Sequence, residues 1–192
     1  GIIQERTKEA IFSEPPESIA FIQCFGSRDI TEKALYCSRV CCGYSTRSAR
    51  VLREYYPKAR IVFFYMELQE VESGNYFNVL NEEGIEFIRC RPVKAKTGKT
   101  SGILYEDPET GRIREEIFDI VVLTEGIHPA ADAERLAEVC GLGLDANGFL
   151  KPVMDGEKTG IYLAGCASGP KSISESCAEA LSAARTIIKG RL

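Results

Sequence analysis

Four cysteines near the start of the chain have a spacing that suits a metal centre. Cys24, Cys37, Cys41 and Cys42 form the pattern C-x12-C-x3-C-C. Four thiolates complete the cysteinyl shell of one cubane iron–sulfur cluster. The pattern lies between a predicted strand and a predicted helix, where nucleotide-binding enzymes carry a glycine-rich phosphate loop. The cysteines therefore indicate an iron–sulfur centre in the place of a nicotinamide site.

Zinc and ordinary thiols are the competing interpretations of this block. Structural zinc sites usually use two short chelating pairs separated by a spacer, and the block has no second C-x2-C pair. The adjacent Cys41 and Cys42 reach separate irons of a cubane more readily than they share one small tetrahedral ion. Buried cysteines also occur simply as small core residues. The spacing favours the cluster and leaves both alternatives open.

The other cysteines and the single histidine are weaker signals. Cys140 and Cys177 lie at the end of one predicted helix and on the apolar side of another, and we interpret both as packing residues. Cys90 follows a predicted strand and is expected to be structural. His128 stands alone in a polar loop, which is a weak case for a catalytic base. Three arginines lie around the block: Arg28, Arg39 and Arg47. Their positive charges would stabilise thiolates. Ordinary solvent-exposed charges on a helix face explain their presence equally well.

Composition limits the class of protein. The chain has 192 residues, of which 44% are hydrophobic, enough for one large domain or two small ones. Its net charge of −4 lacks the basic excess of a nucleic-acid binder. No apolar run approaches the roughly 20 residues that cross a bilayer, and no secretory leader precedes Gly1. We therefore expect a soluble, cytoplasmic protein with reduced thiols and no nucleic-acid partner or membrane span.

Hydrophobic periodicity predicts the elements that position the cysteines. Residues 19–25 and 61–66 are apolar runs typical of buried parallel strands. A helix is expected between them, ending before Pro57. These segments make a βαβ unit with the cysteines at its crossover. The apolar face of that helix is predicted to hold positions 41, 44, 48, 51, 52 and 55. The elements expected next are helix 75–83, strand 85–89, a hairpin of strands 102–106 and 112–118, and strand 119–124.

The last third of the chain predicts a second kind of site. A short helix near Leu136 is followed by an expected strand at 159–165, a turn of small residues and a helix over 172–188. Backbone N–H groups at a helix start and the helix dipole both favour partial negative charge. The turn is therefore expected to seat an electron-rich ring system.

Four strings of residues resemble the A subunit of heterodisulfide reductase, which is the flavin and iron–sulfur component of an electron-bifurcating complex. They are FIQCFGSRD at 21–29, YCSRVCC at 36–42, VVLTEG at 121–126 and YLAGCASGPKSI at 162–173. The resemblance covers roughly residues 19–190. More broadly, the order of elements is similar to that of flavoproteins with two dinucleotide domains, such as thioredoxin reductase.

The resemblance implies a fold and a domain organisation. The fold class is α/β, a three-layer nucleotide-binding type like the NAD(P) domain of thioredoxin reductase, with a partial FAD-domain lobe. Residues 19–124 would be the NAD(P)-domain-like region that carries the cysteines. Residues 125–192 would be the C-terminal part of the FAD-binding domain, and residues 1–18 an N-terminal arm or connection.

The resemblance also implies two sets of site residues. Cys24, Cys37, Cys41 and Cys42 match the family's ligands for a [4Fe–4S] cluster near the flavin. Cys166 stands where relatives such as thioredoxin reductase have an acidic residue, and it is either a small residue beside the flavin or a redox group. The residues that match the turn against the isoalloxazine and ribityl part of FAD are Gly165, Cys166, Ala167, Pro170, Lys171, Ser172 and Ile173.

The chain also departs from the family. It has no G-x-G-x-x-G for the adenosine diphosphate half of FAD, and no ferredoxin-like C-x2-C-x2-C modules. We therefore expect a fragment, an isolated domain or half of a split subunit, with only part of the FAD site. In the whole enzyme, by resemblance, FAD would send single electrons towards disulfide-reducing partner subunits and towards ferredoxin in methanogenesis. A hydrogenase or a formate dehydrogenase-type protein would be the donor.

Two other functions stay open. An NAD(P)H-dependent enzyme like thioredoxin reductase would need a glycine-rich loop after strand 19–25, where the chain has Gly26 alone. A zinc-stabilised interaction module without redox activity would leave the turn at 165–173 unexplained. The sequence thus favours an electron-transfer component of a heterodisulfide reductase-like oxidoreductase.

Overall fold

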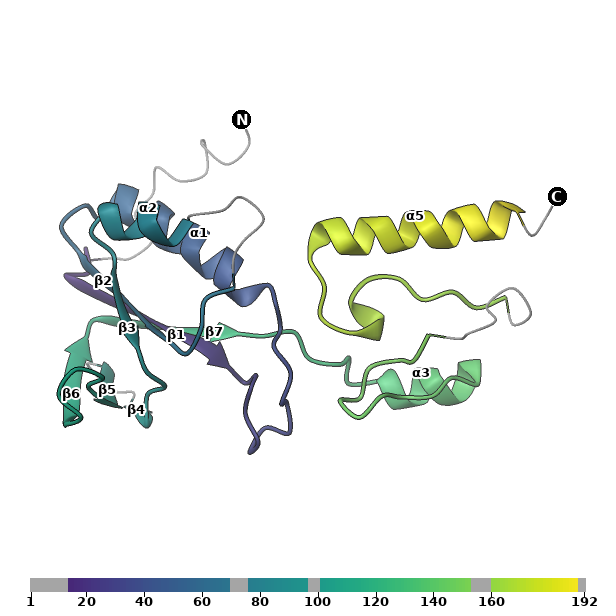
Figure 1. Ribbon diagram of the computed structural model, residues 1–192, viewed down its shortest axis with the longest axis horizontal. Coiled ribbons are helices and arrows are strands. Elements are labelled where there is room, and N and C mark those ends of the chain that lie inside the picture. The colour runs from purple at the N-terminus through teal and green to yellow at the C-terminus, as the bar shows by residue number, and fades with distance from the viewer. Residues whose placement is uncertain (1–13, 70–75, 97–100, 153–159, 190–192) are drawn as a thin grey trace. The chain divides into compact units, whose positions relative to one another are not determined.

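The computed structural model describes residues 14–69, 76–96, 101–152 and 160–189 (Figure 1). Most of the expected arm at 1–18 therefore lies outside the described residues. The chain divides into two compact units. The first takes the residues up to Gln23 together with Cys42–Thr124, and the second takes Cys24–Cys41 together with Glu125–Leu192. The loop that holds most of the cysteine block thus groups with the C-terminal part of the chain.

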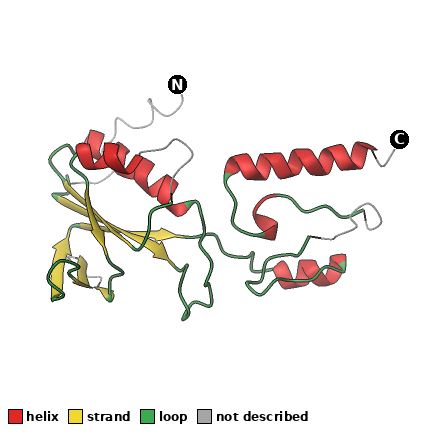
Figure 2. Ribbon diagram, viewed as in Figure 1, coloured by secondary structure: helices red, strands yellow, loops and turns green. Residues whose placement is uncertain are grey.

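A four-stranded sheet forms the centre of the first unit (Figure 2). β1 pairs in parallel with β2, and β2 pairs in parallel with β3. Parallel neighbours need a crossover connection, and helices α1 (Cys41–Tyr55) and α2 (Tyr76–Glu82) supply the two crossovers. The predicted α/β fold is confirmed. From edge to edge the strands are β3 (Glu86–Arg89), β2 (Arg60–Tyr65), β1 (Ser18–Phe25) and β7 (Ile120–Glu125).

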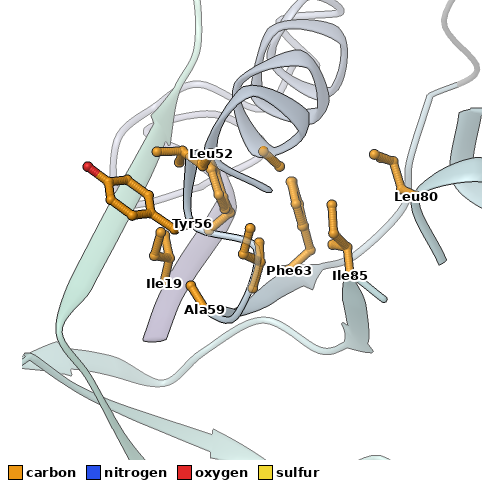
Figure 3. Close-up of a cluster of buried hydrophobic side chains, with 10 residues drawn as sticks. Ile19, Leu52, Tyr56, Ala59, Phe63, Leu80 and Ile85 are labelled. Carbon is orange, nitrogen blue, oxygen red and sulfur yellow. The ribbon is translucent and has the colours of Figure 1, made fainter. Parts of the chain in front are cut away.

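Side chains that alternate along the strands feed two hydrophobic cores, one on each face of this sheet. Ile19 and Phe21 of β1 pack on the side of α1 and α2, where Phe21 stacks on Phe63 with ring centroids 4.6 Å apart. Figure 3 shows this core, with Leu52 of α1 and Leu80 of α2 closing over the strands. The intervening β1 side chains belong to the other core.

A second, antiparallel sheet covers that other face. Its strands run in the order β4 (Lys94–Lys96), β5 (Ser101–Glu106) and β6 (Ile113–Phe118). Tyr105 of β5 lies edge-on against Phe64 of β2, with ring centroids 4.9 Å apart. The predicted hairpin is present as β5 and β6. The first unit therefore has three layers, made of helices, the parallel sheet and the antiparallel sheet.

The buried face of α1 agrees with the predicted one at Cys41 and Leu52 and differs from it at other positions. Ser48 is exposed and the Val51 side chain is 41% exposed, although both were expected to face the core. Small side chains on the true face let the helix approach the sheet closely, and a search for large apolar residues does not detect them. The buried side chains of α1 and of the residue after it are Cys41, Cys42, Ser45, Thr46, Ala49, Leu52 and Tyr56.

The second unit contains little regular structure besides its helices. α3 (Ala133–Cys140) ends at Gly141, whose φ of 64° is the left-handed conformation of a helix cap. A short 3-10 turn, η1 (Gly165–Ser168), precedes α5 (Ile173–Lys189). The prediction of a strand at 159–165 is wrong for residues 160–164, which the structure describes. Residues 160–164 form no strand because no described segment pairs with them, although Ala164 has extended backbone angles.

The apolar side of α5 is exposed among the described residues. Ile173 is 85% exposed and Leu181 is 53% exposed. Cys177 is exposed too, so its expected role as a packing residue is wrong for the part of the chain that the structure describes. Large exposed apolar patches on proteins are commonly interaction surfaces. None of the described helices is long and apolar enough to cross a membrane.

Candidate functional site

The four cysteines of the block lie at the carboxyl end of β1 and around the start of α1. Cys24 is the penultimate residue of β1, and Cys41 and Cys42 open α1. These three are buried, whereas Cys37 in the preceding loop is partly exposed. The start of a helix favours the thiolate form of a cysteine. All eight cysteines of the chain lie within the described residues, and each is a thiol rather than half of a disulfide.

The loop at 24–41 has a strained backbone. Asp29 and Ala34 exchange two backbone hydrogen bonds of 3.0 Å each, which makes a small hairpin inside the loop. Left-handed backbone costs a non-glycine residue about 1–2 kcal/mol. Contacts outside the loop must therefore hold it in place. The non-glycine residues with positive φ are Cys24 (59°), Arg28 (55°), Lys33 (55°) and Arg39 (63°).

One such contact is made by Tyr36, next to Cys37. Its hydroxyl donates a hydrogen bond of 3.1 Å to the carbonyl of Ile127, and its ring lies edge-on against Phe149 at 5.4 Å. Burial and the nearby Asp145 carboxylate raise the pKa of Tyr36, so the hydroxyl stays protonated and remains a donor. The tyrosine thus fixes the loop against the residues that follow β7.

A second contact is the close approach of Gly126 to the loop. A Cβ atom on Gly126 would lie 1.9 Å from Ser38 Oγ and 3.2 Å from Ser27 Cβ, so only glycine fits. Ser27 and Ser38 are fully buried, and neither hydroxyl has a hydrogen-bond partner in the described part of the chain. Buried polar groups without partners are uncommon and each needs an explanation. Here both lie within three residues of a cysteine of the block.

The sulfur of Cys37 accepts a hydrogen bond from the backbone N–H of Arg39, with a nitrogen-to-sulfur distance of 3.3 Å. Hydrogen bonds to sulfur help to set the potential of iron–sulfur centres. The buried hydroxyls of Ser27 and Ser38 would find acceptors in the sulfides of a cluster. The donor chemistry of the loop therefore fits an iron–sulfur group.

The cysteine side chains themselves are not arranged as a metal-binding group in the described part of the chain. No three His, Cys, Asp or Glu side chains among the described residues form a group that could hold a metal ion. The structure thus brings the four cysteines to one loop and one helix start, and their role as a ligand set stays a prediction.

The residues expected to face a flavin form a turn that is stabilised by hydrogen bonds and an ion pair. Gly165 has a φ of 69°, which favours glycine. Lys171 Nζ donates to the Gly165 carbonyl at 3.2 Å and to Ser168 Oγ at 2.7 Å. Glu179 of α5 accepts the Gly165 N–H at 2.9 Å and pairs with Lys171 at 3.3 Å. Cys166, Ala167 and Ile173 are exposed at the surface of this turn.

The start of α5 carries a capping box made by Ser172 and Glu175. The Ser172 N–H donates to Glu175 Oε2 at 2.8 Å, and the Glu175 N–H donates to Ser172 Oγ at 3.2 Å. The Ser172 amide, which was expected to be available to an electron-rich ligand, is thus engaged by the helix itself. The Ser172 N–H and then the Arg39 guanidinium lower the pKa of Glu175, which stays ionised.

The remaining candidates have plain structural surroundings. Burial, and then the Asp107 carboxylate, raise the pKa of Cys90 to about 11, so this thiol is protonated at neutral pH. The imidazole of His128 lies against Gly26, where an added Cβ would be 3.1 Å from Nε2. Arg47 is exposed on α1. Sequence reasoning missed Gly126 and Glu175, although the S-x-x-E spacing at 172–175 is the signature of a capping box.

Curated relatives give an independent comparison, whereas no family model matches the sequence. The chain is 33% identical over 187 residues to the A subunit of the Ferredoxin/F(420)H(2)-dependent CoB-CoM heterodisulfide reductase of Methanosarcina acetivorans, covering 92% of this chain and 24% of that protein. It is 37% identical over 183 residues to the A subunit of the H(2):CoB-CoM heterodisulfide,ferredoxin reductase of Methanothermobacter marburgensis, covering 89% of this chain and 28% of that protein. The chain thus spans about a quarter of the length of these relatives, and its resemblance to them is confirmed over that segment.

Solved structures with a similar fold include two thioredoxin reductases. The enzyme from T. acidophilum is 16% identical with a TM-score of 0.55, and the match covers 88% of this chain and 53% of that one. The enzyme from Lactococcus lactis is 17% identical with a TM-score of 0.56, covering 92% of this chain and 53% of that one. At these identities the likeness shows the fold alone, and that fold is the thioredoxin-reductase type expected from the order of elements.

Proposed function

From this similarity to a segment of the heterodisulfide reductase A subunits, we propose that the chain is an electron-transfer component of a heterodisulfide reductase-like oxidoreductase. Cys24, Cys37, Cys41 and Cys42 hold a [4Fe–4S] cluster. The loop at 24–41 carries the proposal, because its buried thiols, its N–H donor to sulfur and its two unpartnered hydroxyls suit one sulfur-rich group. Such a group, when bound, supplies one-electron transfer.

The protein's own residues prepare this position in three ways. The first turn of α1 places Cys41 and Cys42 where the helix dipole favours negative charge. The Arg39 N–H donates a hydrogen bond to the Cys37 sulfur. Burial of Cys24 excludes water from the side of β1. Together these features stabilise charged sulfur in a protected place.

The flavin contribution of this chain is proposed to be the turn at 165–173. Exposed Cys166, Ala167 and Ile173 offer the ring a surface, while Lys171 and Glu179 keep the turn in shape. The exposed apolar side of α5 is the surface on which the rest of the flavin-binding polypeptide would pack. FAD would therefore bind well only when that polypeptide is present.

The proposed partners follow from the names of the relatives. Those names include ferredoxin, H(2) and, for Methanococcus maripaludis, H(2)/formate alongside the CoB-CoM heterodisulfide. We propose that the whole protein works with other heterodisulfide reductase subunits, with ferredoxin, and with a hydrogenase or formate dehydrogenase-type donor. Flavin-based bifurcation towards disulfide and ferredoxin reduction belongs to the same proposal.

The ligand assignment is tested with single substitutions in the anaerobically prepared chain. Cys41→Ser and Cys42→Ser should each lower the iron content and the broad absorption at about 400 nm. Cys177→Ser, at an exposed position of α5, is the matched control and should leave both unchanged. Unchanged iron in both of the first two variants would overturn the assignment.

A further inference from the structure

We infer that Arg39 is a positioning residue that joins the cysteine loop to the turn before α5. It thereby sets where Cys37 lies relative to the residues proposed to face the flavin. The meaning of this contact rests on the proposed function. The contact itself is a property of the chain without any cofactor, and it can be measured there.

The geometry places Arg39 in contact with both sides. Its backbone N–H donates to Cys37 Sγ at 3.3 Å. Its guanidinium reaches the other way, with Nη1 3.5 Å from the Pro170 carbonyl oxygen and Nη2 2.5 Å from Glu175 Oε1. One residue therefore contacts a sulfur of the cysteine block, the turn and the first turn of α5.

The acceptor that Arg39 uses is itself held in place. The second oxygen of Glu175 takes part in the capping box with Ser172, so the carboxylate is already ordered when Arg39 binds to it. A carboxylate that is already ordered loses little further side-chain freedom on pairing, and the planar guanidinium itself loses less freedom for each hydrogen bond formed than a flexible ammonium group does. The pair also balances the Glu175 charge at the helix start, which the proposed function places next to the flavin.

Magnitudes indicate a positioning role rather than a stabilising one. The side chains of Arg39 and Glu175 are 54% and 39% exposed. Exposed ion pairs of this kind change a folding equilibrium by up to about fivefold. Meanwhile Arg39 keeps a left-handed backbone that disfavours any residue except glycine. The contact therefore has little effect on global stability, and its effect is a local one on where the loop lies.

Hydrogen exchange of the chain without cofactors tests the inference. Arg39→Ala should speed exchange by up to about fivefold at amides of both 37–41 and 172–176, while the unfolding midpoint changes little. Lys33→Ala is the matched control, since Lys33 is an exposed cation of the same loop with the same left-handed backbone. It should leave the amides at 172–176 unchanged.

A double-mutant cycle with Glu175→Gln separates a direct contact from two independent effects. The double variant should exchange no faster at 37–41 than Arg39→Ala alone, because both changes remove the same contact. Additive effects, or an Arg39→Ala change confined to 37–41, would overturn the inference. In chain that has retained iron, Arg39→Ala should also shift the reduction potential, because the loop that carries the N–H hydrogen bond to the Cys37 sulfur is displaced, and Arg39→Lys should shift it less. Wild-type chain without iron would instead refute the proposed function, and the exchange result would still decide the role of Arg39.

Discussion

Replacing Gly126 with alanine tests how closely the cysteine loop is packed. The new Cβ would lie 1.9 Å from Ser38 Oγ and 2.7 Å from Ser38 Cβ. The hydroxyl can rotate away, but the Cβ can move only if the backbone of the loop moves. Because Ser38 is fully buried and adjacent to Cys37, the displacement should reach the cysteine block.

The size of the effect follows from two opposing contributions. Overpacking a close-packed site costs about 1–3 kcal/mol. Replacing glycine with alanine returns about 0.4–1 kcal/mol by restricting the unfolded chain. We therefore expect a net loss of about 1–2 kcal/mol, and for a chain of this size a fall in Tm of about 2–8 °C. Iron retention of the anaerobic chain should fall as well.

Urea unfolding and thermal melting of matched variants check this prediction. Gly143→Ala is the control, because its added Cβ would make only an ordinary contact of 3.6 Å with Lys151. Ser38→Gly removes both clashing atoms, so Gly126→Ala should cost much less in that background than in the wild type. The reasoning would be refuted if Gly126→Ala were as stable as the control, or if Ser38→Gly gave no relief.

Two further predictions concern titratable groups of the first unit. The N–H of Ser18 lowers the pKa of Asp119. The ionised carboxylate therefore stabilises the folded chain at pH values above its ordinary pKa of 3.8. This stabilisation is lost as the pH falls through the lower pKa of the folded state. Asp119→Asn should thus lower the urea midpoint at pH 7 and flatten its acid dependence; an unchanged acid dependence would contradict this. Burial and the Asp107 carboxylate raise the pKa of Cys90 to about 11. Alkylation of Cys90 at pH 8 should therefore be much slower than alkylation of the exposed Cys166. The rate of Cys90 alkylation should rise as the pH is raised towards 11. Equal labelling rates at pH 8, measured by mass spectrometry, would refute the assignment.

The parts of the fold that could be predicted from the sequence are those with strong periodicity. The apolar runs around Phe21 and Phe63 allow few positions other than neighbouring buried strands, and these rings stack in the structure. The hairpin of β5 and β6 follows from a turn between two alternating segments. In both cases local pattern and tertiary packing agree.

Other elements depend on contacts with residues that are distant in the sequence, so no local pattern predicts them. The face of α1 is set by small residues such as Ser45 and Ala49, which carry little hydrophobic signal. β4 is a strand only because β5 lies beside it. Residues 160–164 are extended without a strand neighbour among the described residues.

The candidate site divides in the same way. The spacing of the cysteines predicts the block, and the resemblance to the A subunits predicts the second set of residues. The pairing of Arg39 with Glu175 joins positions far apart in the chain, so no local pattern predicts it. The close approach at Gly126 likewise depends on how the chain folds back on the loop.

The central claim is that the cysteine block binds a cubane cluster, and metal analysis of anaerobically purified wild-type chain tests it most directly. Iron, acid-labile sulfide and zinc should be measured on one sample together with its visible spectrum. The account predicts about four iron and four sulfide per chain, little zinc, and absorption at about 400 nm that bleaches on reduction. One equivalent of zinc without sulfide would contradict the account and favour a structural metal site.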